Sequence, residues 1–138
     1  MLRAVTAGMI CLLVGVTESQ RLCCRVRALR AWTGAIESMR AMNAGLRMPP
    51  MEIWQKAVAE HGAERQDNIL SSAEKALIGQ CYAVMIDGTP DQQEMQLRYA
   101  AERFRALTLQ AENKQQKDAK LYGTLGLLGG LCIFLIIV

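Results

Sequence analysis

The chain has 138 residues, a formal net charge of +3 and only 5% aromatic residues. This length leaves room for one small domain. The weak charge and the scarcity of aromatic groups argue against nucleic acid as a partner, because nucleic-acid-binding proteins concentrate cations and stacking side chains on one surface.

The composition is that of a helical protein. Ala, Leu, Met, Gln, Arg and Glu dominate, and these residues are good helix formers. No segment alternates apolar and polar residues as a half-buried strand would. We therefore predict an all-α fold, a small antiparallel cytoplasmic helical bundle between two transmembrane helices. The predicted boundaries are 1–19 for the N-terminal transmembrane helix, 20–119 for the bundle and 120–138 for the C-terminal transmembrane helix.

Residues 4–16, AVTAGMICLLVGV, form an apolar run behind Arg3. The run could be the core of a signal peptide cleaved after Ser19, or an uncleaved membrane anchor. Short basic flanks resist translocation, and four arginines follow this run. They are Arg21, Arg25, Arg27 and Arg30. We favour an uncleaved anchor with a cytoplasmic middle. The alternative is an exported, cleaved protein held by its tail, with disulfide chemistry at Cys23 and Cys24.

Apolar residues in steps of three and four predict one amphipathic helix from Gln20 to Leu46, continuous with the apolar run. They are Leu22, Val26, Leu29, Trp32, Ile36, Met39 and Leu46. Asn43–Gly45 and the following Pro49 and Pro50 end this helix. A second helix is expected over 51–61, with Gly62 as its stop. Its inward face comprises Ile53, Trp54, Ala57 and Val58.

A polar joint at 63–68 leads to a helix predicted over 69–86. Its inward positions are Leu70, Ala73, Leu77, Tyr82 or Cys81, Val84 and Met85. Asp87-Gly88 is a predicted turn, after which Thr89 is the expected helix cap and Gln92 completes a capping box. Pro90 suits the first helical position. The helix that starts here carries an apolar stripe of Leu97, Ala100, Phe104, Leu107 and Ala111.

Residues 121–138 contain no charge. As a helix they would be about 27 Å long, close to the hydrocarbon core of a bilayer at ~30 Å. Lys114, Lys117 and Lys120 precede them and favour a cytoplasmic flank. Four glycines predict a face on which another helix can pack closely, from the N-terminal segment, another copy or another membrane protein. They are Gly123, Gly126, Gly129 and Gly130.

Little in the chain suggests catalysis. Asp87-Gly88-Thr89 resembles a phosphatase nucleophile motif but lacks its second aspartate, because Met85 stands there. His61 is the only histidine, and the five cysteines show no zinc-ligand spacing. We expect no enzymatic activity, no catalytic residue, no cofactor and no metal.

The C-terminal segment resembles the signature of the stage III sporulation protein AB family, which reads in outline K-x-Y-x-x-L-G-x-x-x-G with an aliphatic end. The residues that carry the resemblance are Lys120-Leu121-Tyr122, Leu125-Gly126 and Leu128-Gly129. A second similar segment contains Leu77 and Gly79, then a turn before Asp91 and Gln93.

This resemblance implies a non-enzymatic component of the channel that joins mother cell and forespore, with a soluble domain similar to that of type II secretion F-type platform proteins. The implied location is the mother-cell membrane, which is the outer membrane of the forespore. The implied partners are a cytoplasmic secretion-type ATPase, which the protein would anchor to the membrane platform, other membrane proteins of the channel and membrane lipid. The resemblance is also compatible with a homo-oligomer. The alternative is a holin-like or other small pore-forming membrane protein, which would need little soluble core.

Overall fold

The computed structural model describes the backbone of residues 2–45 and 48–137, and side chains there except those of 2–12, 14–15, 130–131 and 133–137. Every element in the described ranges is helical, which confirms the all-α prediction. The elements are α1 (Leu2–Gly45), α2 (Pro50–His61), the 3-10 helix η1 (Ala63–Ile69), α3 (Ser72–Asp87) and α4 (Pro90–Ile137).

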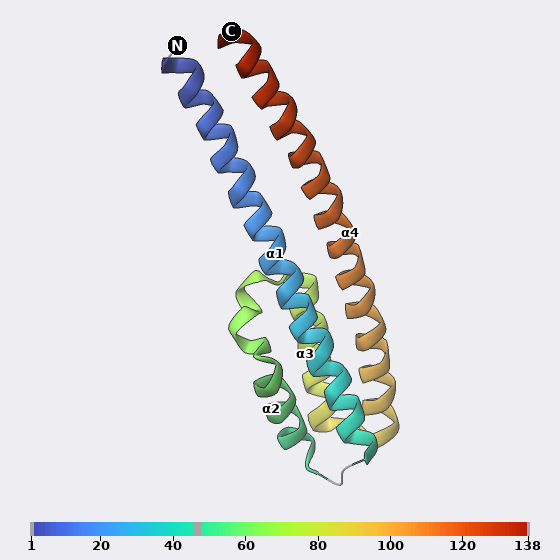
Figure 1. Ribbon diagram of the computed structural model, residues 1–138. Coiled ribbons are helices and arrows are strands. Elements are labelled where there is room, and N and C mark those ends of the chain that lie inside the picture. The colour runs from blue at the N-terminus through green and yellow to red at the C-terminus, as the bar shows by residue number, and fades with distance from the viewer. Residues whose placement is uncertain (1, 46–47, 138) are drawn as a thin grey trace.

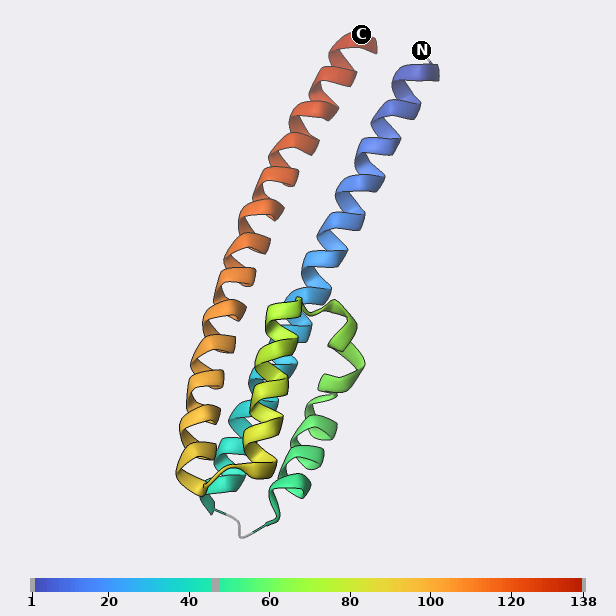
Figure 2. The ribbon, with the colours of Figure 1, turned by 180° about the vertical axis from the view of Figure 1, so that it is seen from behind.

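Two long helices form the frame of the molecule. Helix α1 has 44 residues and α4 has 48, so they are about 66 Å and 72 Å long at 1.5 Å per residue. They run antiparallel and side by side, and both chain ends lie at the same end of the pair (Figures 1 and 2). Helices α2 and α3 pack on the half of the pair that is remote from the chain ends. The molecule therefore has a four-helix bundle at one end and two bare helices at the other.

The predicted membrane segments belong to the bare ends of α1 and α4. Both helices cross the predicted boundaries at 19 and 120 without a break. Over the residues that the structure describes, no helix holds an apolar stretch of the length and hydropathy that a membrane crossing requires. Much of 1–19 and 120–138 lies outside the described side chains, and Met1 and Val138 lie outside the described residues.

The bundle core is built from the stripes that the sequence predicts on α1, α2 and α4. Phe104 of α4 and Leu29 of α1 are fully buried, and Ile36 of α1 is 1% exposed. Trp54 of α2 stacks at a tilt on Trp32, with ring centroids 6.2 Å apart. Burial of these apolar surfaces is the main stabilisation of the fold.

Polar contacts set the register of α1 against α4. The hydroxyl oxygens of Thr33 and Thr108 lie 3.1 Å apart. One turn further toward the chain ends, the Arg30 guanidinium donates to Glu112 Oε1 at 2.8 Å. These contacts join residues that are 75 and 82 positions apart in the chain, so the pairing of the two helices is a purely tertiary feature.

Helix α2 begins at Pro50, one residue before the predicted start, and ends at His61 as predicted. Pro50 occupies its first turn, where the missing N–H costs nothing. Gly62 ends it with φ 60° and ψ 30°, a left-handed conformation that glycine adopts without a Cβ penalty. The ring of His61 lies over Gly34 of α1, where an added Cβ would come within 2.8 Å of His61 Nδ1.

Three predictions for the segment 63–86 need correction. The polar joint is itself helical, as η1. Helix α3 starts at Ser72 and not at Ile69, because Leu70 is extended and Ser71 caps the helix in a capping box with Glu74. Ala73 is therefore exposed instead of inward.

On α3, Cys81 takes the inward position that the sequence left open between Cys81 and Tyr82. Its exposed fraction is 1%, whereas Tyr82 is half-buried at the edge of the core with its ring 5.1 Å from that of Trp54.

The turn between α3 and α4 is held by side chains on both sides. Thr89 Oγ1 accepts from the Gln92 N–H at 3.4 Å, and Gln92 Oε1 accepts from the Thr89 N–H at 3.1 Å, the reciprocal pair of a capping box. The buried amide of Gln93 donates to the carbonyls of Met85 at 3.0 Å and Gly88 at 3.2 Å. Gln93 thus satisfies backbone acceptors that α3 leaves free at its end.

Candidate functional site

Among the side chains that the structure describes, no group of three or more His, Cys, Asp or Glu residues could hold a metal ion. Asp87-Gly88-Thr89, the motif that resembles a phosphatase nucleophile, comprises the last residue of α3 and the turn that leads to α4. A Cβ at Gly88 would collide with the carbonyl oxygen of Val84, to which the Gly88 N–H donates at 2.8 Å. Glycine at this position therefore has a structural reason. The remaining candidates for a functional site are surfaces of the molecule.

The first surface is an apolar stripe on the solvent side of α4. Met95, Tyr99 and Leu109 are exposed by 69%, 56% and 55%. They follow steps of four and ten residues, so they lie on the face of α4 opposite the buried Leu97 and Phe104. We call Met95, Tyr99 and Leu109 the outer stripe. Single exposed apolar residues are ordinary. Three of them on one face of a helix make that face a candidate contact surface.

Acidic groups lie beside the outer stripe at the end of the bundle that is remote from the chain ends. Exposed carboxylates lie at the end of α3 and in the first turns of α4 and α2. Ile86, near the end of α3, is also exposed. These carboxylates belong to Glu52, Asp87, Asp91 and Glu94. This distribution agrees with the sequence, in which residues 51–112 hold ten acidic and six basic residues.

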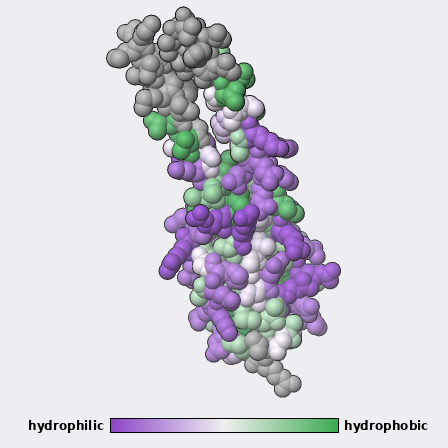
Figure 3. All heavy atoms as spheres, in the orientation of Figure 1, coloured by the Kyte–Doolittle hydropathy of each residue, from purple (hydrophilic) through white to green (hydrophobic). Residues whose placement is uncertain are grey.

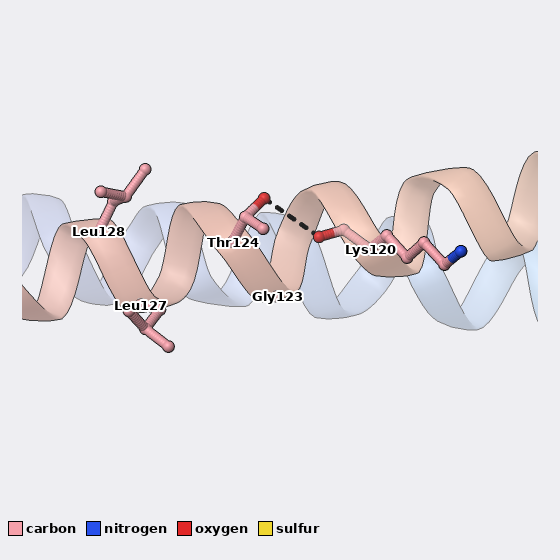
Figure 4. A pocket seen from close by; sticks show the side chains of 5 residues that line it. All are labelled: Lys120, Gly123, Thr124, Leu127 and Leu128. Carbon is pink, nitrogen blue, oxygen red and sulfur yellow. Dashed lines mark hydrogen bonds between the residues drawn. The ribbon is translucent and has the colours of Figure 1, made fainter.

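The second surface lies where the bundle gives way to the bare helices. A shallow pocket of about 550 Å³ lies on α4 and is lined by Lys120, Gly123, Thr124, Leu127 and Leu128. Figure 4 shows these residues. The Lys120 side chain extends along the helix away from the two leucines, and the Thr124 hydroxyl donates to the Lys120 carbonyl at 3.1 Å. In Figure 3 hydrophilic residues cover most of the bundle, and hydrophobic residues gather on the helices above it.

The predicted glycine face lies on this bare part of α4. An added Cβ at Gly123, Gly126 or Gly129 would meet no described atom within 4 Å. Gly130 lies outside the residues whose surroundings are described. A packing partner for this face stays a prediction.

Sequence reasoning missed one partly buried ion pair. Glu74, 4% exposed, accepts from Arg25 of α1 at 2.9 Å through Oε1 and from the Ser71 N–H at 2.8 Å through Oε2. This carboxylate ties the start of α3 to α1 at the upper rim of the bundle. The spacing Ser71-x-x-Glu74 is a capping-box signature that could have revealed its local role. Its bond to Arg25 has no sequence signal.

Cys81 is the one thiol in the bundle core among the described cysteines. Burial raises its pKa from the ordinary 9.0 to about 11, and a contact of 4.0 Å with the Gln96 amide opposes this rise. A thiol with a raised folded-state pKa stabilises the fold fully below pH 9.0 and loses this contribution as pH rises through about 11.

We therefore expect Cys81 to resist a water-soluble maleimide at pH 8 while the exposed Cys23 and Cys24 react. Mass spectrometry of labelled peptides would measure this. Denaturant should raise the labelling rate of Cys81 at least about tenfold, because unfolding of the core exposes the Cys81 thiol to the reagent. Equal native rates for all three thiols would contradict the burial of Cys81.

A family model described as stage III sporulation protein AB matches residues 39–138. The match covers the last residues of α1 and all of α2, η1, α3 and α4. Comparisons with curated proteins and with solved structures gave no match.

Proposed function

Since the chain belongs to the stage III sporulation protein AB family, we propose that this sporulation protein is a membrane component of the channel between mother cell and forespore. In this role it anchors a cytoplasmic secretion-type ATPase to the membrane platform and couples the ATPase to it. Its place would be the mother-cell membrane that surrounds the forespore, where other membrane proteins of the channel are also partners. The protein acts by binding, without an enzymatic reaction of its own.

The observation that carries the proposal is the separation of two ends along one rigid pair of helices. Residues 121–137 of the uncharged tail and the apolar run 4–16 lie at the same end of α1 and α4. The bundle lies at the other end, with the outer stripe and the carboxylates near it. The pair α1–α4 is continuous between these ends, so a force applied to the bundle would be transmitted to the anchor without an intervening loop.

The outer stripe is the proposed contact for the ATPase. Tyr99 is an amphipathic aromatic residue of the kind that dominates interface energetics, and Met95 next to it adapts to a partner surface. The neighbouring carboxylates Asp91 and Glu94 would steer a basic partner surface toward the stripe.

The test is deletion of the gene in its spore-forming host, followed by complementation. Loss of the protein should arrest development after engulfment, with small forespores and a silent late forespore reporter. Normal spores after deletion would contradict the channel role, and a membrane-leakage assay would then test the holin-like function.

Complementation with Met95→Asp plus Tyr99→Asp should fail, and recruitment of a fluorescent ATPase fusion to the membrane should fall at least about tenfold. A charged group on each side chain would have to be desolvated in the interface, whereas in the free protein both positions are exposed. The matched control is Ala83→Asp on the exposed side of α3, which should support sporulation. Immunoblots would verify equal protein levels. Full recruitment by the double variant would reject the outer stripe as the contact.

A further inference from the structure

A groove opens at the end of the bundle nearest the chain ends, between α1 and the last residue of η1. Its volume is about 710 Å³. Arg21 and Arg25 contribute guanidinium groups to its lining, Glu18 contributes a carboxylate, and Leu22 and Ile69 contribute apolar surface. Ile69 is 40% exposed although it is a large apolar residue. Cations beside apolar side chains suit an amphiphile with an anionic head better than a small polar solute.

The register of α1 against α4 brings further cations to the level of this groove. Arg30 bonds to Glu112 at 2.8 Å. Nine residues closer to the chain ends, Arg30 is followed by Arg21 on α1 and Glu112 by Leu121 on α4, so these two positions lie at the same level. The stretch 21–27 of α1 therefore lies beside 114–120 of α4. We call the cations of these two stretches the basic belt: Arg21, Arg25, Arg27, Lys114, Lys117 and Lys120.

Most of the basic belt is free to meet an external anion. Arg25 donates from one nitrogen to the buried Glu74, but its side chain is 46% exposed and keeps further N–H donors for an anion. Arg21 makes only a 3.4 Å contact with Glu18, with side chains 80% and 50% exposed. Among the described residues, Arg27 and the three lysines of the belt make no ion pair. Asp118 is the acidic residue within the two stretches, and Glu18 and Glu74 pair with Arg21 and Arg25. Three acidic groups thus oppose six cations, and the belt keeps a net positive charge below the uncharged tail.

We propose that the groove and the basic belt form a binding site for anionic phospholipid, with the phosphate-bearing head at Arg21 and Arg25 and an acyl chain along Leu22 and Ile69. The inference rests on the membrane anchoring proposed above, because that anchoring places the belt at headgroup depth. Each cation near an anionic lipid surface strengthens the attraction about fivefold. Bound lipid would hold the upper rim of the bundle against the membrane.

The experiment uses the full chain, purified in an uncharged detergent. Native mass spectrometry would measure retention of phosphatidylglycerol and of phosphatidylcholine with the same acyl chains. We expect phosphatidylglycerol to bind at least about tenfold more tightly, since several belt cations act together. A large excess of inorganic phosphate should not displace it, because phosphate lacks the acyl chain that the apolar wall binds. Displacement by phosphate would reject the lipid and leave a simple anion site.

Arg21→Gln should weaken phosphatidylglycerol binding about fivefold. The matched control is Arg98→Gln, because Arg98 also makes a 3.4 Å surface contact, with Glu102, but lies at the far end of the bundle. Equal effects of the two variants, or equal binding of the two lipids, would overturn the proposal.

The lipid-binding measurement needs neither ATPase nor sporulating cells. A failed complementation with intact lipid selectivity would therefore reject the channel role alone, and lost selectivity with normal complementation would reject the lipid site alone.

Discussion

Replacing Phe104 with alanine is expected to lower the free energy of unfolding by about 3–5 kcal/mol. Phe104 is fully buried and is one of the largest side chains in the core. It lies on α4 one turn before Thr108, where α4 contacts α1, so the cavity would open at the contact between the two long helices. The rigid packing of a bundle core permits only partial collapse into such a cavity.

Tryptophan fluorescence during urea titration would measure this loss. Both tryptophans of the chain, Trp32 and Trp54, lie in or against the core, so the signal reports the bundle and not the bare helices. Leu109→Ala is the control on the same helix, because Leu109 is 55% exposed, and it should change stability by no more than about 0.5 kcal/mol. A loss below about 1 kcal/mol for Phe104→Ala would show that the core is not packed around this ring.

Glu74→Ala is expected to cost about 2–3 kcal/mol in the same assay. The substitution removes a charge-assisted hydrogen bond from Arg25 and the acceptor for the Ser71 N–H. The cost stays below that of breaking a fully buried ion pair, because the Arg25 side chain is 46% exposed and can rehydrate. Glu74→Gln keeps an acceptor for Ser71 and should lose about half as much.

The control for Glu74→Ala is Glu102→Ala. Glu102 pairs with Arg98 at the surface, and both side chains are more than half exposed, so this loss should stay within about 0.5 kcal/mol. A double-mutant cycle of Glu74→Ala with Arg25→Ala isolates the coupling between the two residues. A coupling energy near zero would mean that Glu74 acts only as part of the cap on α3.

The helices themselves were predictable from local patterns. The buried stripes of α1 and α4 follow the predicted steps of three and four, and Gly62 ends α2 in the left-handed conformation. The start of α3 was predicted wrongly because the apolar Ile69 and Leu70 were read as helical, although Ser71 and Glu74 form the capping box behind them. The periodicity of apolar residues therefore located the faces of helices better than it located their ends.

Some of the surfaces proposed for function could be recognised in the sequence, and others only in the structure. The uncharged ends and the basic residues beside them are legible in the sequence, and so is the acidic excess of the middle. The outer stripe becomes visible only when burial shows which face of α4 is covered, because Met95 and Leu97 are both apolar and only two positions apart. The choice between Cys81 and Tyr82 was open for the same reason, since neighbouring residues on a helix differ by about 100° in direction.

By itself the sequence determined that this protein is helical, where its caps and stops lie, and that its two ends are apolar with basic flanks, because propensity, capping and hydropathy act over a few neighbouring residues. Only the tertiary structure decided that the two ends lie together, that Arg25 reaches Glu74, and that Arg21–Arg27 and Lys114–Lys120 form one belt. These features depend on the antiparallel register of α1 and α4. That register arises from side chains such as Thr33 and Thr108, which are 75 positions apart and meet only when the core is packed.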